Sequence, residues 1–300
     1  MDGATREKYL QAGRLAGRGR EFGRTLVVPG ARLLDVATEV EAFVRKEGGA
    51  PAFPCCISVN DDAAHDTPGV ADARVFRVGD LVKLDVGVQI DGYIGDTATT
   101  VEVGGGTRFA TLIEASVRAL DTALSLVKDG LEVREIGAAV EATIKGYGFV
   151  PIANLTGHSV DRYHQHAGLS IPNVPTRGSG TLKEGMAVAI EPFATDGAGK
   201  VRDAAGGRIF HFVSPRPQRD PLARQALDLI RERHAQLPFA ERWIAEAVPE
   251  AKVSYAMRIL ERSGAVRQYP VLHEARDGMV AQTEHTVLVE KMGCTITTRA

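Results

Sequence analysis

Cysteine and net charge are scarce in this 300-residue sequence, and no long apolar run is present. The three cysteines lack the spacing of a disulfide framework or of a closed thiolate zinc site, so we expect reduced thiols. A formal net charge of -2 with scattered basic residues argues against nucleic acid as a partner. No apolar stretch approaches the roughly 18 residues of a membrane span, and no signal-peptide core is present. These absences favour a cytoplasmic protein that does not bind membranes.

The composition that remains is typical of a globular enzyme, with 44% hydrophobic and 25% charged residues. A chain of this length can form one large domain or two small ones with a substantial core. We predict a single catalytic domain over residues 1–300 and expect it to be a monomer.

Two stretches of the sequence are similar at an offset of 100 residues, which indicates a duplicated unit. The alternative is a pair of amphipathic helices that look alike by accident. The eight identities in the first copy, each repeated 100 positions later, are Leu26, Val27, Gly30, Val40, Glu41, Ala42, Gly48 and Pro51.

Apolar residues recur at helical spacing inside each copy, from Leu33 to Val44 and from Val133 to Ile144. Helices also fit residues 5–24 and 109–127, so we expect two helices on one face of a sheet in each half. The strongest strand signals lie at 81–103, 187–193 and 285–290. Residues 216–268 show a helical pattern without strands, with helices predicted at 222–236, 239–246 and 254–263.

Two aspartates lie on the two arms of the predicted hairpin at 81–103, which turns at Asp91-Gly92. With a two-residue loop, Asp85 pairs with Ala98 and Asp96 pairs with Gly87. Both carboxylates then share one face of the sheet, diagonally placed and within reach of one metal ion. A single strand aspartate is more often solvent-facing, but two neighbouring anions on an apolar sheet call for a cation between them.

Three further residues complete a candidate metal site. Glu191 follows the apolar run MAVAI, and Glu284 lies in the similar segment AQTEHTVLVE, where an unpartnered carboxylate would be costly. His158 lies in a segment with three histidines, although a lone histidine is more often a packing residue. Oxygen ligands with one imidazole suit Mn, Fe, Co or Zn, and four carboxylates balance two divalent ions. Such a pair of ions activates water for hydrolysis of an amide or ester.

The chain resembles the type 2 methionine aminopeptidases, the archaeal and eukaryotic kind, over nearly its full length. Each motif alone is weak, but together they are specific. The matching stretches are PAFPCCISVNDDAAHDTP (51–68), VKLDVGVQIDGYIGDTATTV (82–101), NLTGHSVDRYHQHAGLSIPNVP (154–175), MAVAIEPFAT (186–195), LPFAERW (237–243), and QYPVLHE with VAQTEHTVLVE (268–290).

The resemblance implies an α+β "pita-bread" fold, with two pseudosymmetric halves around an antiparallel sheet and helices outside. It also implies a winged-helix-like helical insertion at 208–268, which is typical of type 2 and separates Glu191 from Glu284 by 93 positions. Two divalent ions per chain (Co, Mn, Fe, Zn or Ni) are implied as cofactors. In the family pattern Asp85 holds one ion, Asp96 and Glu284 bridge both, and His158 and Glu191 complete the second.

The same resemblance assigns the remaining roles. Glu191 would move the proton from the attacking water to the leaving amine. His65 and His166 would contact the scissile amide, and Phe53, Phe193 and Tyr269 would wall the methionine pocket. The implied substrate is the N-terminal methionine of nascent polypeptides whose second residue is small and uncharged.

Two other interpretations stay open at this point. An Xaa-Pro aminopeptidase or prolidase carries nearly the same ligands, but usually has a separate domain before the catalytic one, for which the first ligand at residue 85 leaves no room. A noncatalytic pita-bread binding protein would have lost ligands, whereas all five candidate ligands and both histidines are present here.

Overall fold

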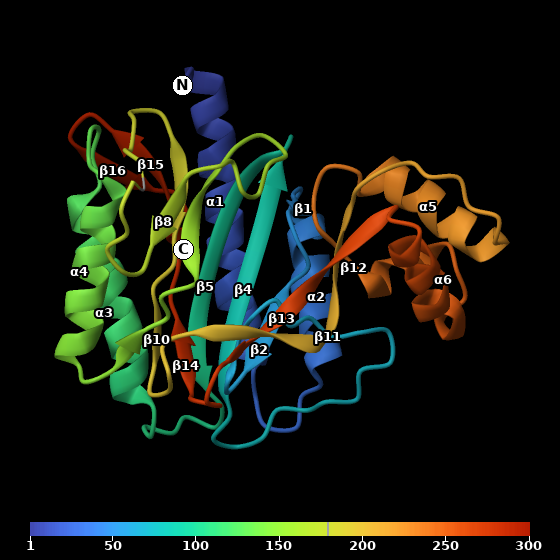
Figure 1. Cartoon of the computed structure of the whole chain (residues 1–300), viewed down its shortest axis with the longest axis horizontal. Helices are drawn as coiled ribbons and strands as arrows, with labels where there is room; N and C mark the ends of the chain where they lie inside the picture. Colours follow the sequence, from blue (N-terminus) through green and yellow to red (C-terminus); the bar gives the residue numbers. More distant parts are fainter. Residues whose placement is uncertain (179) are drawn as a thin grey trace.

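Two helix pairs and a set of small antiparallel sheets build the protein, for which a computed structural model describes residues 1–178 and 180–300. Helices α1 (Gly3–Leu26) and α2 (Leu33–Lys46) pack against the first half, and α3 (Ala110–Leu126) and α4 (Val133–Gly146) against the second. In Figure 1, α1 lies behind the central β4–β5 hairpin, α2 lies to its right, and α3 and α4 stand at its left. The four helices predicted outside the sheet are confirmed.

The duplicated unit appears in the structure as the same run of elements. In each copy a helix ends at a glycine and is followed by a two-residue strand, β1 (Ala50–Pro51) or β6 (Val150–Pro151). Gly48 and Gly148 have φ values of 87° and 84°, the left-handed conformation that commonly ends a helix. Because this conformation strains other residues, the glycines are the local reason why both helices stop where they do.

The hairpin of β4 (Leu81–Ile90) and β5 (Tyr93–Glu102) has the predicted register, with Asp85 opposite Ala98 and Asp96 opposite Gly87. Its turn residues Asp91 and Gly92 both have positive φ, 50° and 89°, as a tight two-residue loop requires. Strands β1 and β2 (Cys56–Val59) pair with the other edge of β4. The two aspartates are therefore fixed relative to each other on neighbouring strands, Asp85 on the central strand β4 and Asp96 on β5.

The second half carries a five-stranded sheet in the order β16-β15-β9-β7-β8 and a three-stranded sheet in the order β14-β10-β6. The pairings among all strands are antiparallel, as predicted. The bounds are β7 (Thr156–Val160), β8 (Ser170–Pro172), β9 (Ala187–Ile190), β10 (Phe193–Thr195), β14 (Val280–Gln282), β15 (His285–Glu290) and β16 (Gly293–Ile296).

A fourth sheet, in the order β12-β11-β13-β3, was not predicted from the sequence. Its two long strands are β11 (Val201–Phe212) and β13 (Val266–Glu274), flanked by β12 (Phe239–Ala240) and β3 (Asp62–Ala64). The ladder shifts between Ala204 and Ile209, next to Pro270 on the partner strand. A run of alanine and glycine in β11 and a proline in β13 hide these strands from a pattern-based prediction, because both features weaken the strand signal.

Helices α5 (Pro221–Arg233) and α6 (Glu250–Arg262) confirm two of the three helices predicted between 216 and 268. The helix predicted at 239–246 is wrong in its first part: β12 comes first, and a 3-10 helix follows at Glu241–Glu246. These elements form a separate apolar cluster, which includes Leu227, Ile230 and Met257. Figure 1 shows them at the right of the molecule, attached through β11 and β13.

Candidate metal centre

The centre of the molecule holds a buried group of carboxylates and histidines where the two halves meet. Asp96 of β5 and Thr286 of β15 exchange two hydrogen bonds, and the Glu284 backbone N–H donates to the Ala98 carbonyl at 3.1 Å. These contacts join strands from opposite ends of the chain. As a result, candidate ligand atoms of Asp96, His158 and Glu284 all lie within 4.8 Å of one another.

All five predicted ligands line one cavity, which also receives His65 and His166. His158 Nε2 lies 3.6 Å from Asp96 Oδ2 and 3.8 Å from Glu191 Oε1. Asp85 reaches the cavity from β4, and Glu191 from the end of β9. The structure therefore brings together every residue that was predicted as a metal ligand.

The electrostatics of this group show that it lacks a positive charge. Burial raises the pKa of Asp85 to about 7, and burial with the neighbouring carboxylates Asp85 and Glu191 raises the pKa of Asp96. The pKa values of Glu191 and Glu284 are raised for the same reasons. Burial and the nearby His166 lower the pKa of His158 to about 3, so no imidazolium compensates the carboxylates.

Three carboxylate oxygens at this centre are buried and have no hydrogen-bond partner among the described residues: Asp85 Oδ1, Asp96 Oδ1 and Glu284 Oε2. An unpaired buried oxygen of this kind is costly unless a ligand completes it. Oxygen donors with one neutral imidazole fit borderline or hard divalent ions. The residues present therefore fit the two divalent cations that the sequence predicts.

The two other predicted histidines face the same cavity without belonging to the carboxylate group. His65 follows β3 in a left-handed conformation with φ of 63°, and burial with the nearby His166 lowers its pKa to about 4. His166 lies beside His158, with ring centroids 4.4 Å apart, and burial lowers its pKa. Both imidazoles are neutral at pH 7 and can offer an N–H to a bound molecule.

Of the three aromatic residues predicted as pocket walls, Phe53 and Tyr269 line the cavity. Phe193 is not among the residues that line it: it is buried in another cluster with Ala63, Ala64, Ile152 and Val280, and its role as a substrate contact stays a prediction. Phe193 lies two residues after Glu191, which suggested a common face. Pro192, however, separates β9 from β10, and these strands belong to different sheets. The alternation of side chains along β9 therefore does not continue into β10, and the two-residue spacing does not place Phe193 on the same face as Glu191.

Several residues of the site were missed. Gln165 and Gln282 donate to predicted ligands: Gln165 Nε2 lies 2.5 Å from Asp96 Oδ2, and Gln282 Nε2 lies 3.2 Å from Glu191 Oε2. Gln165 stands next to His166, and Gln282 stands two residues before Glu284; an amide this close to a predicted site residue is the signal that marks them. The other lining residues are Cys56, Ala64, Ile209 and Pro238. Cys56 is a buried free thiol, as expected, whereas Ile209 and Pro238 come from the unpredicted sheet and the segment after α5.

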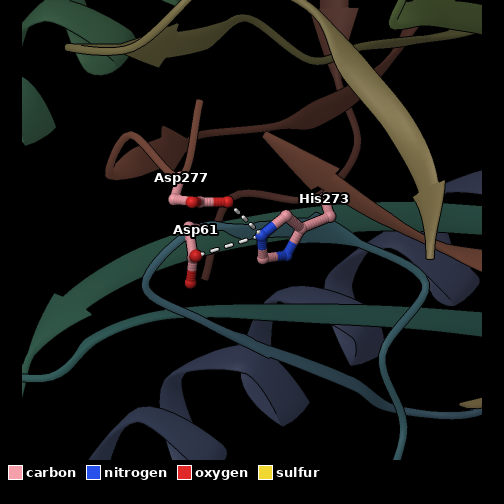
Figure 2. Close-up of side chains that lie close together, drawn as sticks. All are labelled: Asp61, His273 and Asp277. Carbon is pink, nitrogen blue, oxygen red and sulfur yellow. Dashed lines mark hydrogen bonds and ion pairs between the residues drawn. The ribbon is translucent and has the colours of Figure 1, made fainter. Parts of the chain in front are cut away.

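A second carboxylate–histidine group lies outside this cavity. His273 of β13 places its Nε2 3.1 Å from Asp61 Oδ2 and 3.0 Å from Asp277 Oδ1, as Figure 2 shows. Its Nδ1 lies 2.9 Å from Asp62 Oδ1. This group is partly exposed and joins β13 to β3 and to the turn that precedes β14.

A buried set of four carboxylates and one histidine, on an antiparallel sheet beside two neutral imidazoles, defines a metal-dependent hydrolase. The chain belongs to metallopeptidase family M24, which matches residues 7–291. Among residues 1–178 and 180–300, no helix has the length and apolar composition needed to cross a membrane.

Proteins with similar sequences and a similar structure support this assignment. The chain is 46% identical to a methionine aminopeptidase of Thermococcus onnurineus over 294 residues, which cover 98% of this chain and 99% of the relative. It is also 46% identical to a methionine aminopeptidase of Archaeoglobus fulgidus, with full coverage of both chains. A crystal structure of methionine aminopeptidase from Thermotoga maritima has the same fold, with a TM-score of 0.74 at 24% identity over 100% of this chain and 98% of that one.

Proposed function

We propose that this chain is a methionine aminopeptidase of type 2, a cytoplasmic monomer that removes the N-terminal methionine from nascent polypeptides with two divalent ions. One observation carries the proposal: all five ligands and both histidines of the implied pattern line a single cavity. The same cavity has aromatic and apolar walls from Phe53, Tyr269 and Ile209. These lining residues are the kind expected of a catalytic centre that adjoins a pocket for a substrate side chain.

Asp85 would hold one ion, His158 and Glu191 the other, and Asp96 and Glu284 both. When bound, two such ions supply Lewis acidity, which acidifies water and polarises a peptide carbonyl. Carboxylate and imidazole ligands accept Co, Mn, Fe, Zn or Ni, so the availability of each metal decides which ion is used.

Glu191 is the residue placed to move the proton. One oxygen faces His158, and the other accepts the amide N–H of Gln282, which fixes the orientation of the carboxylate. Glu191 takes the proton of the attacking water and passes it to the leaving amine, the role of a general base and then a general acid. Neutral His65 and His166 offer N–H groups to the amide oxygen as it becomes negative.

The walls of the cavity supply the selectivity for methionine. Phe53, Cys56, Ile209 and Tyr269 give an apolar surface for an unbranched thioether side chain, beside the carboxylates where the substrate amine lies. We expect a small, uncharged second residue to be preferred, as the family resemblance implies.

The region between Glu191 and Glu284 supports the assignment to type 2. We propose residues 208–268 as an insertion within a single catalytic domain of residues 1–300. Helices α5 and α6 have their own apolar core, while Ile209 and Pro238 reach the catalytic cavity. The insertion therefore contributes to the pocket as well as to the outer surface.

The test compares two peptides and counts metal. Chelated protein is titrated with Mn, Fe, Co, Zn or Ni, and hydrolysis of Met-Ala-Ser and of an Xaa-Pro peptide is followed. We expect release of methionine from Met-Ala-Ser only, with activity that rises up to two bound ions per chain. Cleavage of the Xaa-Pro peptide alone would assign the chain to the prolidase group, and inactivity on both peptides after metal loading would favour a noncatalytic binding protein.

A further inference from the structure

One polar side chain in the catalytic cavity has no role in the scheme above. Gln165 lies on the loop between β7 and β8 and is only 9% exposed. Its Nε2 donates to Asp96 Oδ2 at 2.5 Å, across 69 positions of the sequence. The loop is held beside the hairpin by a backbone hydrogen bond from Tyr163 to Gly92. Gln165 is therefore fixed against the most central carboxylate of the site.

Packing does not explain a glutamine at this position. Gln165 Oε1 is buried and has no hydrogen-bond partner among the described residues. A buried carbonyl left in this way costs on the order of 1–3 kcal/mol. An apolar side chain of similar size, such as methionine, would fill the same space at the cavity wall without that cost. The contact of Nε2 with Asp96 is what distinguishes glutamine from methionine here.

The contact also selects one oxygen of Asp96. Asp96 Oδ2, which accepts from Gln165, is the oxygen that lies 3.6 Å from His158 Nε2. Asp96 Oδ1 is buried and has no hydrogen-bond partner in the described parts of the chain, so it is left for the other side of the site. A carboxylate that bridges two ions needs this division of its oxygens, and free rotation of the carboxylate would lose it.

We propose that Gln165 is a positioning residue for the metal centre: its amide N–H fixes the Asp96 carboxylate so that Oδ2 faces the His158 side and Oδ1 faces the Asp85 side. This inference rests on the proposed dimetal function. Gln165 itself is neither a ligand nor a proton carrier. Hydrogen-bond partners of ligands typically change metal affinity or activity by about 10- to 100-fold when they are removed.

The experiment measures metal binding directly. Chelated wild-type protein and Gln165→Met are titrated with Mn²⁺ by calorimetry, and the electron paramagnetic resonance signal of coupled Mn²⁺ pairs is recorded in parallel. For the wild type we expect two equivalents and a coupled signal. For Gln165→Met we expect the second equivalent to bind about 10- to 100-fold more weakly, with the coupled signal lost at limiting metal and the first equivalent changed by less than about threefold.

Gln218→Met is the matched control. Gln218 has the same exposed fraction as Gln165, 9%, and its Nε2 is likewise a hydrogen-bond donor, here to the Arg216 carbonyl and to Ser263 Oγ. Unlike Gln165, it lies in the inserted segment. We expect wild-type binding of both equivalents in this variant. A general effect of burying methionine in place of glutamine would change both variants alike and would contradict the proposal.

A second variant covers the case in which Gln165→Met fails to fold, which a thermal melt detects. Gln165→Asn keeps the amide but is one methylene too short to reach Asp96, so the same loss of the second equivalent is expected. Wild-type affinity for both equivalents in either folded variant would overturn the role of Gln165. Failure of the wild type itself to bind two ions would instead overturn the proposed function, so the two failures are distinguishable.

Discussion

The two carboxylate–histidine groups of this protein contain the same residue types and have opposite electrostatics. In the buried group of Asp96, His158 and Glu284, the pKa of the histidine falls to about 3 and those of the carboxylates rise. In the partly exposed group of Figure 2, burial opposes protonation of His273, but hydrogen bonds to Asp62 and Asp277 outweigh it and raise its pKa. The hydrogen bonds at this group thus favour the protonated imidazole, whose charge is opposite to that of the carboxylates.

The difference shows that composition alone does not define a metal site. Where water reaches the carboxylates, a protonated imidazole balances them at little cost. Where water is excluded, the imidazole loses its proton and unpaired carboxylate oxygens remain, so only an added cation completes the group. We therefore expect the buried group to hold catalytic metal and the exposed group to act as an ionic link between β3, β13 and the turn before β14.

The largest expected effect is that of Glu191→Gln. The variant keeps the shape of the side chain but cannot take a proton, so turnover of Met-Ala-Ser should fall by about 10²- to 10⁴-fold. Steady-state kinetics on metal-loaded protein gives the measurement, with a metal count and a thermal melt as controls for loading and folding. Near-wild-type turnover in the loaded variant would remove Glu191 from proton transfer.

A pair of histidine variants compares the two groups directly. His166→Ala removes an N–H that faces the substrate amide, and kcat/KM should fall by about 10²- to 10³-fold. His273→Ala removes a histidine of the exposed group, and kcat/KM should change by less than about threefold. If both variants lost activity equally, the separation of the two groups into catalytic and structural roles would be wrong.

The pH dependence of stability offers a third comparison. In metal-free protein the pKa of Asp85 is about 7, above its ordinary value of 3.8. The folded state thus keeps a proton that the unfolded chain releases, and this group lowers the free energy of unfolding by about 1.4 kcal/mol per pH unit between about pH 4 and 7. Urea denaturation of chelated protein measures this slope.

Asp85→Asn is the control for that slope, since it cannot release the proton and should make the slope smaller, while Asp96, Glu191 and Glu284 still contribute to it. Loading with Mn²⁺ should also flatten it, because the ion replaces the missing charge. An equal slope in chelated wild type and chelated Asp85→Asn would show that burial does not hold this carboxyl in its neutral form.

The smallest effect is expected at His273. Its pKa is raised above 6.5, so its contribution to stability is full below pH 6.5 and is lost as the pH rises through the folded-state value. His273→Gln should lower the free energy of unfolding at pH 6 and should lower it by much less at pH 9. A difference from the wild type that is the same at both pH values would mean that the ionic link contributes nothing.

Sequence reasoning found the parts of the site that short segments determine. The two-residue turn of the hairpin determines the register of its strands, so the sequence alone predicts that Asp85 and Asp96 form a diagonal pair. The buried carboxylates Glu191 and Glu284 were found because each stands in an apolar segment where a lone charge is costly. The family resemblance then added His65 and His166, which local pattern does not single out.

What was missed depends on contacts between distant segments. Strands β11 and β13 contain glycine, alanine and proline, and their pairing with each other and with β12 and β3 stabilises them as a sheet. Gln165 contacts a carboxylate 69 positions away, and the exposed group brings Asp61 close to His273. The change of sheet at Pro192, which separates Phe193 from the face of Glu191, is likewise not visible in the sequence.

Counting bound metal tests the central claim most directly. Wild-type protein and the variants Asp96→Ala and Asp277→Ala are dialysed against Mn²⁺, and the metal per chain is measured by mass spectrometry. The account predicts two ions for the wild type and for Asp277→Ala, and fewer than two for Asp96→Ala. A third ion in the wild type that Asp277→Ala removes, or two ions retained by Asp96→Ala, would contradict it.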